Sequence, residues 1–420
     1  MHVVGAGLAG LAAALTLAEA GLAVRVYEQA PRGGGRCRSF WDDKLSLKID
    51  NGNHFVMSGN EAAMGLLRRN GAGEAAVIGP AEALFPFYDH ADGSRFTVRP
   101  GRARTPLWAL QRGRSVPGAS ALEFLEGAKL LAADPDATLN QVIRRRGKLW
   151  RGFWEPLAIA ALNAEPAQCQ ARLLAPVLTK TFLRGGAYCR PLIARETLAD
   201  AFVEPTVAAI ERLGGQVRFG ARVRGLEFGE RGVASLRLSE GAVTLGPRDL
   251  LVLAVPPTRA KELAPDLTTP EDGEPILNAH FRLAQAPPIG GGEVPLMGVL
   301  GAATQWIAVR GVHASLTISA ASALAEEEEA TLLPRLWEET RAALGLPAGS
   351  GYEAARIIRE KRATFLPTPA NVRRRPQAVT RWPNLILAGD WTDTGLPATI
   401  EGAITSGDTA GRIALERVRR

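Results

Sequence analysis

Short apolar runs separated by glycine-rich turns open the sequence. Residues 3–4 are apolar and lead into Gly-x-Gly-x-x-Gly at residues 5–10, and an Ala- and Leu-rich stretch then runs to Gly21. A second apolar run, residues 23–27, ends in Glu28. This order predicts a strand, a tight turn, a helix and a second parallel strand, which is the βαβ unit of dinucleotide-binding proteins.

Such a unit binds a dinucleotide through backbone N–H groups and one acidic side chain. The glycines allow close backbone approach, so a pyrophosphate can sit on the free N–H groups of the helix start. An acid roughly 20 residues further on binds the ribose hydroxyls, and the Glu28 carboxylate would repel a 2′-phosphate. The residues predicted to hold the dinucleotide here are Gly5, Gly7, Leu8, Ala9, Gly10 and Glu28.

After the first βαβ unit, the spacing of apolar residues is typical of strands in some segments and of helices in others. Residues 84–88 and 95–98 predict a hairpin around an Asp-Gly turn, and the helical spacing between 119 and 183 predicts helices. We expect a helix over 197–213, and residues 250–255 predict a buried strand. Antiparallel strands and one helix, which includes the acidic run Glu326 to Glu329, are expected between 270 and 365.

Three later motifs specify the dinucleotide. Residues 33–36 read Gly-Gly-Gly-Arg, residues 388–390 read Ala-Gly-Asp after an apolar strand, and residues 398–407 open the last helix. Together they resemble the flavin amine oxidase and phytoene desaturase superfamily. The resemblance implies FAD, with a helix N-terminus that stabilises negative charge on the reduced ring. The further cofactor contacts that it implies are Gly35, Arg36, Asn53, Val223, Gly389, Asp390, Thr399 and Ile400. No Cys lies in the late flavin segment, so we expect non-covalent attachment.

A closer resemblance spans nearly the whole chain. The segments that carry it are residues 49–54, 153–158, 189–193, 278–281, 360–365 and 395–403. They look like the squalene-associated FAD-dependent desaturases, whose best-known members are hydroxysqualene dehydroxylases of bacterial hopanoid synthesis. One departure is the first strand, which has only three residues after Met1, and this sequence leaves open whether the natural start lies upstream.

These observations predict an α/β fold: a Rossmann-like FAD-binding domain of the GR2 type with an interleaved α+β substrate domain. We place FAD-binding segments at 1–80, 195–269 and 366–420, and substrate-domain segments at 81–194 and 270–365. The 420 residues, 46% of them hydrophobic, suffice for two cores.

Composition narrows the remaining classes. Three cysteines without paired spacing argue against a disulfide framework, and no apolar run reaches the ~18 residues of a spanning helix. The apolar strand follows Met1 at once, so no signal peptide is predicted, and a cytoplasmic protein is expected. The densest basic clusters, 144–146 and 373–375, are not interleaved with aromatics, so we expect no nucleic-acid partner. No metal site is predicted, and nothing indicates an oligomeric state.

The resemblance implies reductive dehydroxylation of hydroxysqualene to squalene. Hydroxide leaves poorly, so an acid should protonate the departing oxygen. His54 is the best placed candidate, because the superfamily chain passes beside the flavin ring there. Glu155 lies in an apolar stretch, where it either serves as the acid or pairs with Arg190. Asp50 precedes a tight turn and is the third candidate, with capping of backbone N–H groups as the alternative. NAD(P)H is a chemically reasonable electron donor.

The substrate adds a constraint of its own. Transfer of some thirty carbons from water to a pocket is worth on the order of 20 kcal/mol, so free aqueous substrate would be negligible. We therefore predict a long-chain triterpene substrate taken from a membrane or a partner enzyme, and peripheral contact with the cytoplasmic face through a basic surface. An apolar tunnel should be lined from 119–183 and 276–320. Its expected lining residues are Phe153, Trp154, Phe182, Tyr188, Phe281 and Trp306.

Two other function classes stay open at this point. One is an oxidative relative, either a polyprenoid desaturase or an amine oxidase; residues 395–398 (Gly-Leu-Pro-Ala) replace the aromatic expected in amine oxidases. The other is a non-catalytic lipid-binding protein on the same scaffold, like the Rab GDP-dissociation inhibitors. Glu28, Arg36 and Asp390 argue against the latter, because they would bind a cofactor.

Overall fold

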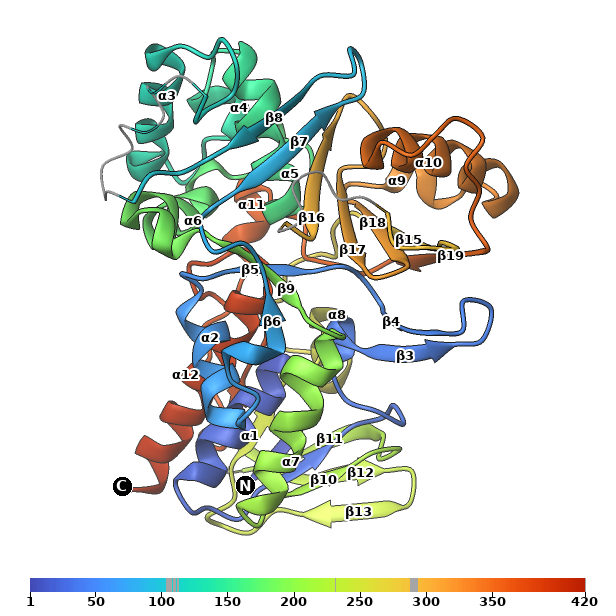
Figure 1. The fold of residues 1–420 in the computed structure, drawn as a ribbon. Helices are drawn as coiled ribbons and strands as arrows, with labels where there is room; N and C mark the ends of the chain where they lie inside the picture. The colour runs from blue at the N-terminus through green and yellow to red at the C-terminus, as the bar shows by residue number, and fades with distance from the viewer. Residues whose placement is uncertain (103–107, 109–110, 112, 231, 288–293, 420) are drawn as a thin grey trace.

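A five-stranded parallel sheet joins segments from both ends of the chain. The computed structural model describes residues 1–420 except 103–107, 109–110, 112, 231, 288–293 and 420. The strand order is β10-β2-β1-β14-β20. The strands are β1 (His2–Val4), β2 (Arg25–Tyr27), β10 (Gln216–Arg218), β14 (Leu251–Leu253) and β20 (Leu385–Leu387). Val3 pairs with Val26 on one side and Val252 on the other, so this sheet unites the N-terminal and late segments (Figure 1).

Helices cover one face of this sheet and a second sheet covers the other. Val3 faces the helices α1 (Leu8–Glu19), α2 (Glu61–Asn70), α7 (Glu204–Arg212) and α12 (Ile400–Val418). Its neighbour Val4 faces an antiparallel sheet of β11 (Val223–Gly229), β12 (Gly232–Leu238) and β13 (Gly241–Thr244). Because successive strand residues point to opposite faces, the near-continuous apolar runs of the sequence are explained by burial on both sides.

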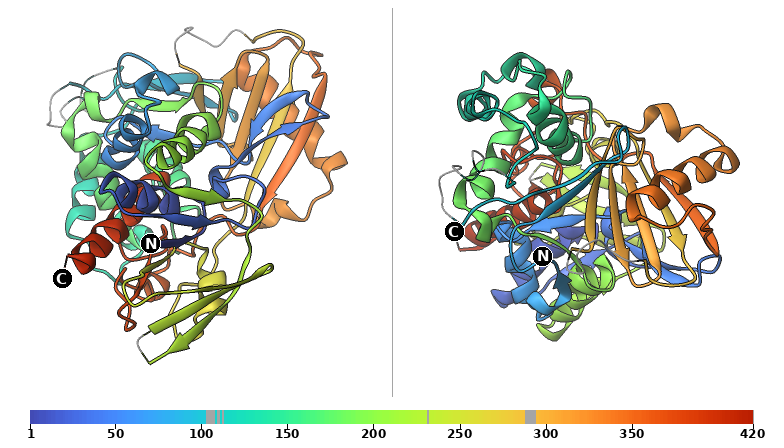
Figure 2. Two further views of the ribbon diagram at one scale, coloured as in Figure 1. Left: turned by 90° about the horizontal axis from the view of Figure 1, so that it is seen from below. Right: turned by 45° about the horizontal axis from the view of Figure 1, so that its top comes forward.

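A seven-stranded sheet forms the second part of the molecule, seen edge-on in Figure 2. Its order is β19-β15-β18-β17-β16-β7-β8. The strands are β7 (Phe85–Asp89), β8 (Arg95–Val98), β15 (Ile276–Arg282), β16 (Leu296–Leu300), β17 (Trp306–Arg310), β18 (His313–Ile318) and β19 (Ala354–Glu360). The helix α10 (Glu329–Leu344) packs on its outer face, and the inner face turns toward the loop between β4 and β5.

Short helices fill the region between β8 and β9. They include α3 (Ala121–Gly127), the 3₁₀-helix Ala128–Ala132, α4 (Leu139–Val142), a π-helical turn (Trp150–Trp154), α5 (Glu155–Leu162) and α6 (Ala175–Lys180). Figure 1 places this helical region at the far end of the molecule from β11–β13. None of the helices within the described residues is both long and apolar enough to cross a membrane.

Smaller elements connect the two parts. A hairpin of β3 (Ser39–Asp42) and β4 (Leu47–Asp50) precedes a three-stranded sheet of β5 (Phe55–Met57), β9 (Pro191–Ala194) and β6 (Val77–Ile78). The short helices α8 (Pro257–Leu263), α9 (Ser322–Ala325) and α11 (Pro369–Val372) complete the fold.

Most of the predicted elements are present. The hairpin over 84–98 is confirmed, and the helix expected over 197–213 is a π-helical turn, Ala199–Val203, followed by α7. The acidic run was placed wrongly: α10 begins only at Glu329, with Glu328 as its N-cap residue. Negative charge before a helix N-terminus is favourable, which explains why the run precedes the helix.

Candidate functional site: a dinucleotide cradle beside a polar-to-aromatic sheet face

The glycine turn brings β1 close to α1. Gly5 has a φ of 104°, and a Cβ there would lie 2.4 Å from the Ala254 carbonyl oxygen. A Cβ on Gly10 would lie 1.9 Å from the Gly5 oxygen, so only glycine permits this approach. Gly7, by contrast, has open space where its Cβ would stand. No side chain of the N-cap residue satisfies the first N–H groups of α1, which leaves those of Leu8 and Ala9 available to an anion.

The acid after β2 reaches this turn. Glu28 Oε2 accepts a hydrogen bond from the Ala6 N–H at 2.8 Å, and Oε1 accepts one from Ala30 at 2.8 Å. The carboxylate is therefore held beside the N-terminus of α1, as the spacing predicts.

The glycine-rich segment after Glu28 lies against the first turn. The Gly34 N–H donates to the Ala6 carbonyl at 2.7 Å, and a Cβ on Gly35 would lie 3.4 Å from Gly7 Cα. Arg36 follows and binds the C-terminal motif: its Nη2 donates to Asp390 Oδ1 at 2.6 Å. Although burial alone would lower the pKa of Arg36, Asp390 raises it above its ordinary value. Residues 354 positions apart thus share one ion pair.

A buried arginine that the sequence did not reveal supports the Asp390 turn. Arg375 belongs to the basic run 373–375, but its side chain is 5% exposed and lies over the Phe365 ring. Its Nη2 donates to the carbonyls of Asp390 and Thr392, at 3.1 and 2.5 Å. Burial lowers the pKa of this guanidinium, and a charge run alone gave no sign of it.

The N-terminus of α12 is the last part of the proposed cofactor site. We call this site the cradle; its other parts are the turn at residues 5–10, Glu28, residues 33–36 and Asp390. Thr399 is its N-cap residue and accepts a hydrogen bond from the Gly402 N–H at 3.1 Å, and Ile400 is buried as its first residue. The next residue, Glu401, accepts hydrogen bonds from the Ala62 and Ala63 N–H groups at the start of α2. Since α1 and α12 also meet closely at Gly407, the helix start is fixed from two sides.

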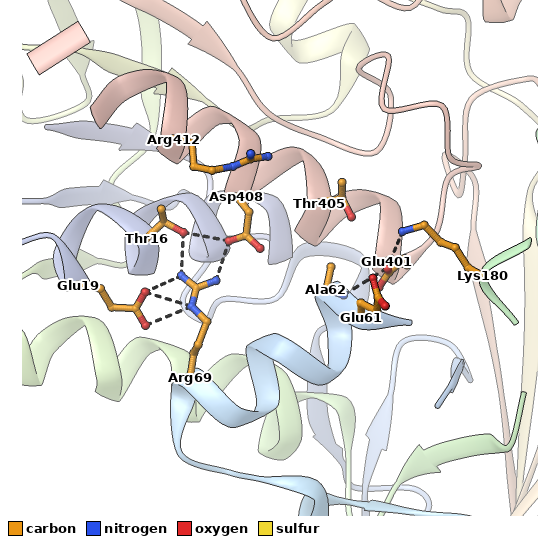
Figure 3. Close-up of a pocket in the computed structure, with 10 residues that line it drawn as sticks. All are labelled: Thr16, Glu19, Glu61, Ala62, Arg69, Lys180, Glu401, Thr405, Asp408 and Arg412. Atoms are coloured by element: carbon orange, nitrogen blue, oxygen red, sulfur yellow. Dashed lines mark hydrogen bonds and ion pairs between the residues drawn. The ribbon is translucent and has the colours of Figure 1, made fainter. Parts of the chain in front are cut away.

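A pocket of about 460 Å³, lined mostly by polar and charged residues, lies beside this helix start (Figure 3). There Arg69 of α2 donates to Asp408 of α12 at 2.7 Å and to Glu19 of α1 at 2.9 Å. Thr16 also donates to Asp408, and Lys180 pairs with Glu401 at 3.4 Å (Figure 3). This network ties three helices together and thereby positions the α12 N-terminus.

Val223, the expected adenine contact, begins β11 and is buried. It lies next to the segment that follows Glu28, because the Ala221 N–H donates to the Glu28 carbonyl at 2.8 Å. Its own carbonyl accepts a hydrogen bond from Arg259 at 2.7 Å.

The loop after β4 contacts a row of polar side chains on the inner sheet face. Asn278 accepts from the Asn53 N–H and donates to the Asn51 carbonyl, both at 3.4 Å. Ser315 donates to Asn53 Oδ1 at 2.8 Å. Beside them His280 and His313 form a buried pair, with Nδ1 and Nε2 3.0 Å apart. Of these, Asn278 and His280 belong to a segment that carried the resemblance, whereas the position of Ser315 gave no signal.

The three acid candidates occupy different surroundings. Asp50 is buried and accepts hydrogen bonds from Ser39, the Leu198 N–H and Arg310, at 2.7, 2.8 and 2.9 Å. Glu155 accepts a hydrogen bond from the Trp150 indole at 3.2 Å. Arg190 is not among its hydrogen-bond or ion-pair partners within the described residues, and Glu155 belongs to the helical region as the first residue of α5.

His54, the third candidate, lies in the loop that joins β4 to β5, between Asn53 of the polar contacts and Phe55. Burial lowers its pKa below the ordinary value; the positive charge of Arg36 acts in the same direction, and Asp50 opposes them. The fold thus brings His54 within the electrostatic reach of both Arg36 and Asp50.

The polar row gives way to aromatic rings at β17. Trp306 lies 5.3 Å from Phe55 and 5.6 Å from Phe87, and Phe182 lies 5.9 Å from Phe85 and 5.3 Å from Phe153, as centroid distances. We call these rings and their neighbours the aromatic cluster: Phe55, Phe85, Phe87, Phe96, Trp108, Phe124, Phe153, Trp154, Phe182 and Trp306.

One residue expected in the tunnel lining, Phe281, lies elsewhere. The prediction for Phe281 is wrong, because this side chain points to the outer face of the sheet and packs on Trp337 of α10, at 5.2 Å. Strand alternation places Asn278 and His280 on the inner face and therefore Phe281 on the other. Tyr188 lies under the Arg184 guanidinium, 3.8 Å from it.

The residues of the cradle fit FAD. Helix N–H groups suit a pyrophosphate, and a carboxylate beside them suits ribose hydroxyls. Buried N–H groups of Arg375 and Asn53 have no partner within the described residues, which suits a ligand rich in acceptors.

The three cysteines are buried and unpaired, and burial raises the pKa of each thiol to about 12.

Comparison with known proteins shows the family to which this chain belongs. The profile described as flavin containing amine oxidoreductase matches residues 8–415. The chain belongs to this family. It is 42% identical to hydroxysqualene dehydroxylase of Rhodopseudomonas palustris, over 99% of this chain and 98% of that protein. It is 40% identical to the protein of the same name from Sinorhizobium fredii, with the same coverage. The prediction of an FAD-dependent oxidoreductase with this ancestry is confirmed.

Two solved oxidase structures share the fold of this chain. Cyclohexylamine oxidase from Brevibacterium oxydans superposes with a TM-score of 0.73 at 15% identity, covering 100% of this chain and 99% of that one. A putative protoporphyrinogen oxidase from Exiguobacterium gives 0.67 at 18% identity, covering 99% and 98%. The predicted α/β fold class is confirmed; the domain bounds and the individual site residues stay predictions.

Proposed function

We propose that this chain is a hydroxysqualene dehydroxylase, which replaces the allylic hydroxyl of hydroxysqualene with hydrogen to give squalene. The observation that carries the proposal is the near-full-length identity of about 40% with relatives of that name. The cradle and the aromatic cluster support it, because they supply a place for a redox cofactor and an apolar surface for a triterpene.

The reaction divides between cofactor and protein. Bound FAD, once reduced, supplies the hydride that forms the new C–H bond. The allylic C–O bond breaks, and the oxygen leaves as water once it has gained a proton. The chain itself must therefore hold the triterpene, keep bulk water out and deliver that proton.

We assign the proton delivery to His54. It lies at the junction of the cradle and the aromatic sheet face, beside the Arg36 and Asn53 that the resemblance assigns to the flavin. Its lowered pKa makes the protonated ring a stronger acid than free imidazolium, since burial disfavours the charged form. Activity should therefore rise as the pH falls from neutrality, until the fold itself is lost.

The other two carboxyl candidates suit supporting roles. All of the hydrogen bonds to Asp50 come from structural donors, so we propose that it fixes the loop on which Asn53 and His54 lie. Glu155 lies in the helical region at the Trp150 indole, and we propose that it orients the aromatic cluster around the substrate.

The apolar substrate also sets the partners. Because a triterpene is scarcely present in free aqueous form, we propose that the enzyme collects it from the membrane surface as a cytoplasmic, peripherally bound protein. For the electrons, NADH and NADPH can be compared directly as donors by the anaerobic bleaching of bound flavin.

The test is a product analysis. Chemically reduced holoenzyme should convert hydroxysqualene to squalene under anaerobic conditions, and oxidised enzyme should not act on squalene. A His54→Gln variant should retain its flavin but lose roughly 10²–10⁴-fold in rate. Squalene oxidation without dehydroxylation would instead make the protein a desaturase, and a purified protein without flavin would contradict both.

A further inference from the structure

Three leucines are exposed on the helical region. Leu122 and Leu125 of α3 are 57% and 66% exposed, and Leu131 of the following 3₁₀-helix is 47% exposed. Large apolar side chains so close in the chain are costly to leave in water, and such patches mark binding surfaces. No other stretch of described residues places three exposed leucines within ten positions.

The opposite face of α3 contacts the aromatic cluster. Residues of a helix are separated by about 100°, so Phe124 lies about 160° around the helix from Leu122 and about 100° from Leu125. The Phe124 ring lies 5.9 Å from Trp108 and 6.4 Å from Phe153. One thin helix therefore separates the exposed leucines from the apolar interior.

A basic loop flanks the leucines. Glu126 of α3 accepts a hydrogen bond from the Arg145 N–H at 2.9 Å and pairs with Lys129 at 3.1 Å. Glu123 lies against Gly147, where its carboxylate fills the position of a Cβ. These contacts hold residues 144–148 alongside α3, with Arg144, Arg145, Arg146 and Lys148 all exposed.

The exposed charged side chains of α3, the 3₁₀-helix and residues 144–148 are all cationic, and the exposed acids nearest to them along the chain, Asp134 and Asp136, follow the 3₁₀-helix. Both acids of α3 are only 8% exposed, whereas the cations of the flanking loop and Lys129 are exposed. A face that offers leucines flanked by cations fits a bilayer with anionic headgroups, since each Lys or Arg near such a surface is attracted to it.

We propose that α3, the 3₁₀-helix Ala128–Ala132 and residues 144–148 form a docking surface for anionic phospholipid bilayers. This docking surface, which rests on the proposed function for its purpose, places the aromatic cluster directly above the membrane that holds the triterpene. Figure 1 shows it at the end of the molecule opposite to β11–β13, so docking leaves the cradle side accessible to an electron donor.

A second copy of this chain fits the surface less well. Most homodimers pair the same patch of both subunits around a two-fold axis. Here that arrangement would set cations against cations, which opposes association. Self-association through this face would therefore contradict the proposal, and it is readily measured as a mass change that Leu122→Ser abolishes.

The test is vesicle flotation of the holoenzyme. Wild-type protein should float with phosphatidylglycerol-containing vesicles at low salt, and less so with phosphatidylcholine vesicles or at high salt. The Leu122→Ser/Leu125→Ser variant should bind about tenfold more weakly for each leucine, and Arg144→Glu/Lys148→Glu about fivefold for each cation.

Matched controls lie at the other end of the molecule. Leu213 is 46% exposed after α7, and Arg222 and Arg248 are exposed near β11–β13. Leu213→Ser and Arg222→Glu/Arg248→Glu should float like wild type. Equal flotation of the docking-surface variants and these controls would overturn the proposal.

Activity separates this proposal from the proposed function. The docking-surface variants should lose dehydroxylation of vesicle-borne hydroxysqualene yet keep wild-type rates in detergent micelles, with unchanged flavin content. Loss in both media would contradict a role in docking. If wild type itself fails in micelles but still floats, the proposed function falls while the docking surface stands.

Discussion

The cradle and the aromatic cluster differ in the kinds of groups from which they are built. The cradle is built from backbone groups, glycines and a few charges drawn from segments as distant as Gly5 and Asp390. The aromatic cluster is built from side-chain bulk on short, broken helices and one sheet face. The first needs particular residues at particular positions, whereas the second needs enough apolar volume in the right place. Substitutions in the cradle should therefore affect folding and flavin binding, whereas substitutions in the aromatic cluster should affect substrate binding.

The largest contrast should come from two glycines of one turn. Gly10→Ala should unfold the domain or abolish flavin binding, because its Cβ would lie 1.9 Å from the Gly5 oxygen. Gly7→Ala should fold, since open space surrounds that position, but should bind FAD weakly where the pyrophosphate approaches. Melting temperature and flavin absorbance measure both. Equal loss of stability in the two variants would contradict the assignment of Gly7 to the cofactor.

Two tryptophans, Trp306 on the inner face of the seven-stranded sheet and Trp337 of α10 packed against its outer face, sharpen the comparison. Trp306→Leu should raise KM for hydroxysqualene several-fold with flavin content unchanged, because Trp306 belongs to the aromatic cluster. Trp337→Leu removes a ring from the outer face and should cost about 2–4 kcal/mol of stability without changing KM. Steady-state kinetics and denaturant unfolding separate them. A KM change in the Trp337 variant alone would reverse the roles of the two faces.

The smallest effect concerns acid stability. Burial lowers the pKa of His280 well below its ordinary value and that of His313 to about 3, and Arg310 adds to both shifts. Below about pH 6.5 the unfolded chain binds protons that the folded chain refuses, so stability is full above that pH and falls as the pH drops toward 3.

The loss should reach about 1.4 kcal/mol per pH unit for each of the two histidines. Denaturant unfolding between about pH 6.5 and 5 should therefore show a shallower slope for His313→Gln than for wild type. Identical slopes would mean that the pair does not titrate on unfolding.

The cradle was largely predictable because its chemistry is local. The turn at Gly5, the acid Glu28 and the late Gly-Asp each have a short sequence pattern with a physical cause, and the fold class follows from them. The resemblance assigned Arg36 and Asp390 to one cofactor, but their ion pair was not predicted, since nothing in the spacing links residues so far apart. Arg375 escaped notice because burial depends on the tertiary fold and not on its basic neighbours.

The substrate side was less predictable for the same reason. Phe281 is as aromatic as Trp306, but strand register alone decides which face each occupies, and one position along a strand reverses the side. Likewise the exposed leucines of α3 have the same spacing as buried ones. Only the structure shows which side of that helix meets the cluster.

The sheet order β2-β1-β14-β20 has a consequence for biosynthesis. On the ribosome, β1 lacks one of its two neighbours until residue 253 has been translated, and Arg36 lacks its counter-charge until residue 390 emerges. A nascent chain therefore cannot gain the stabilisation that a bound cofactor gives to a folded state until the final helix is released. Chaperone dependence and sensitivity to flavin supply during expression should accordingly concentrate at the end of synthesis.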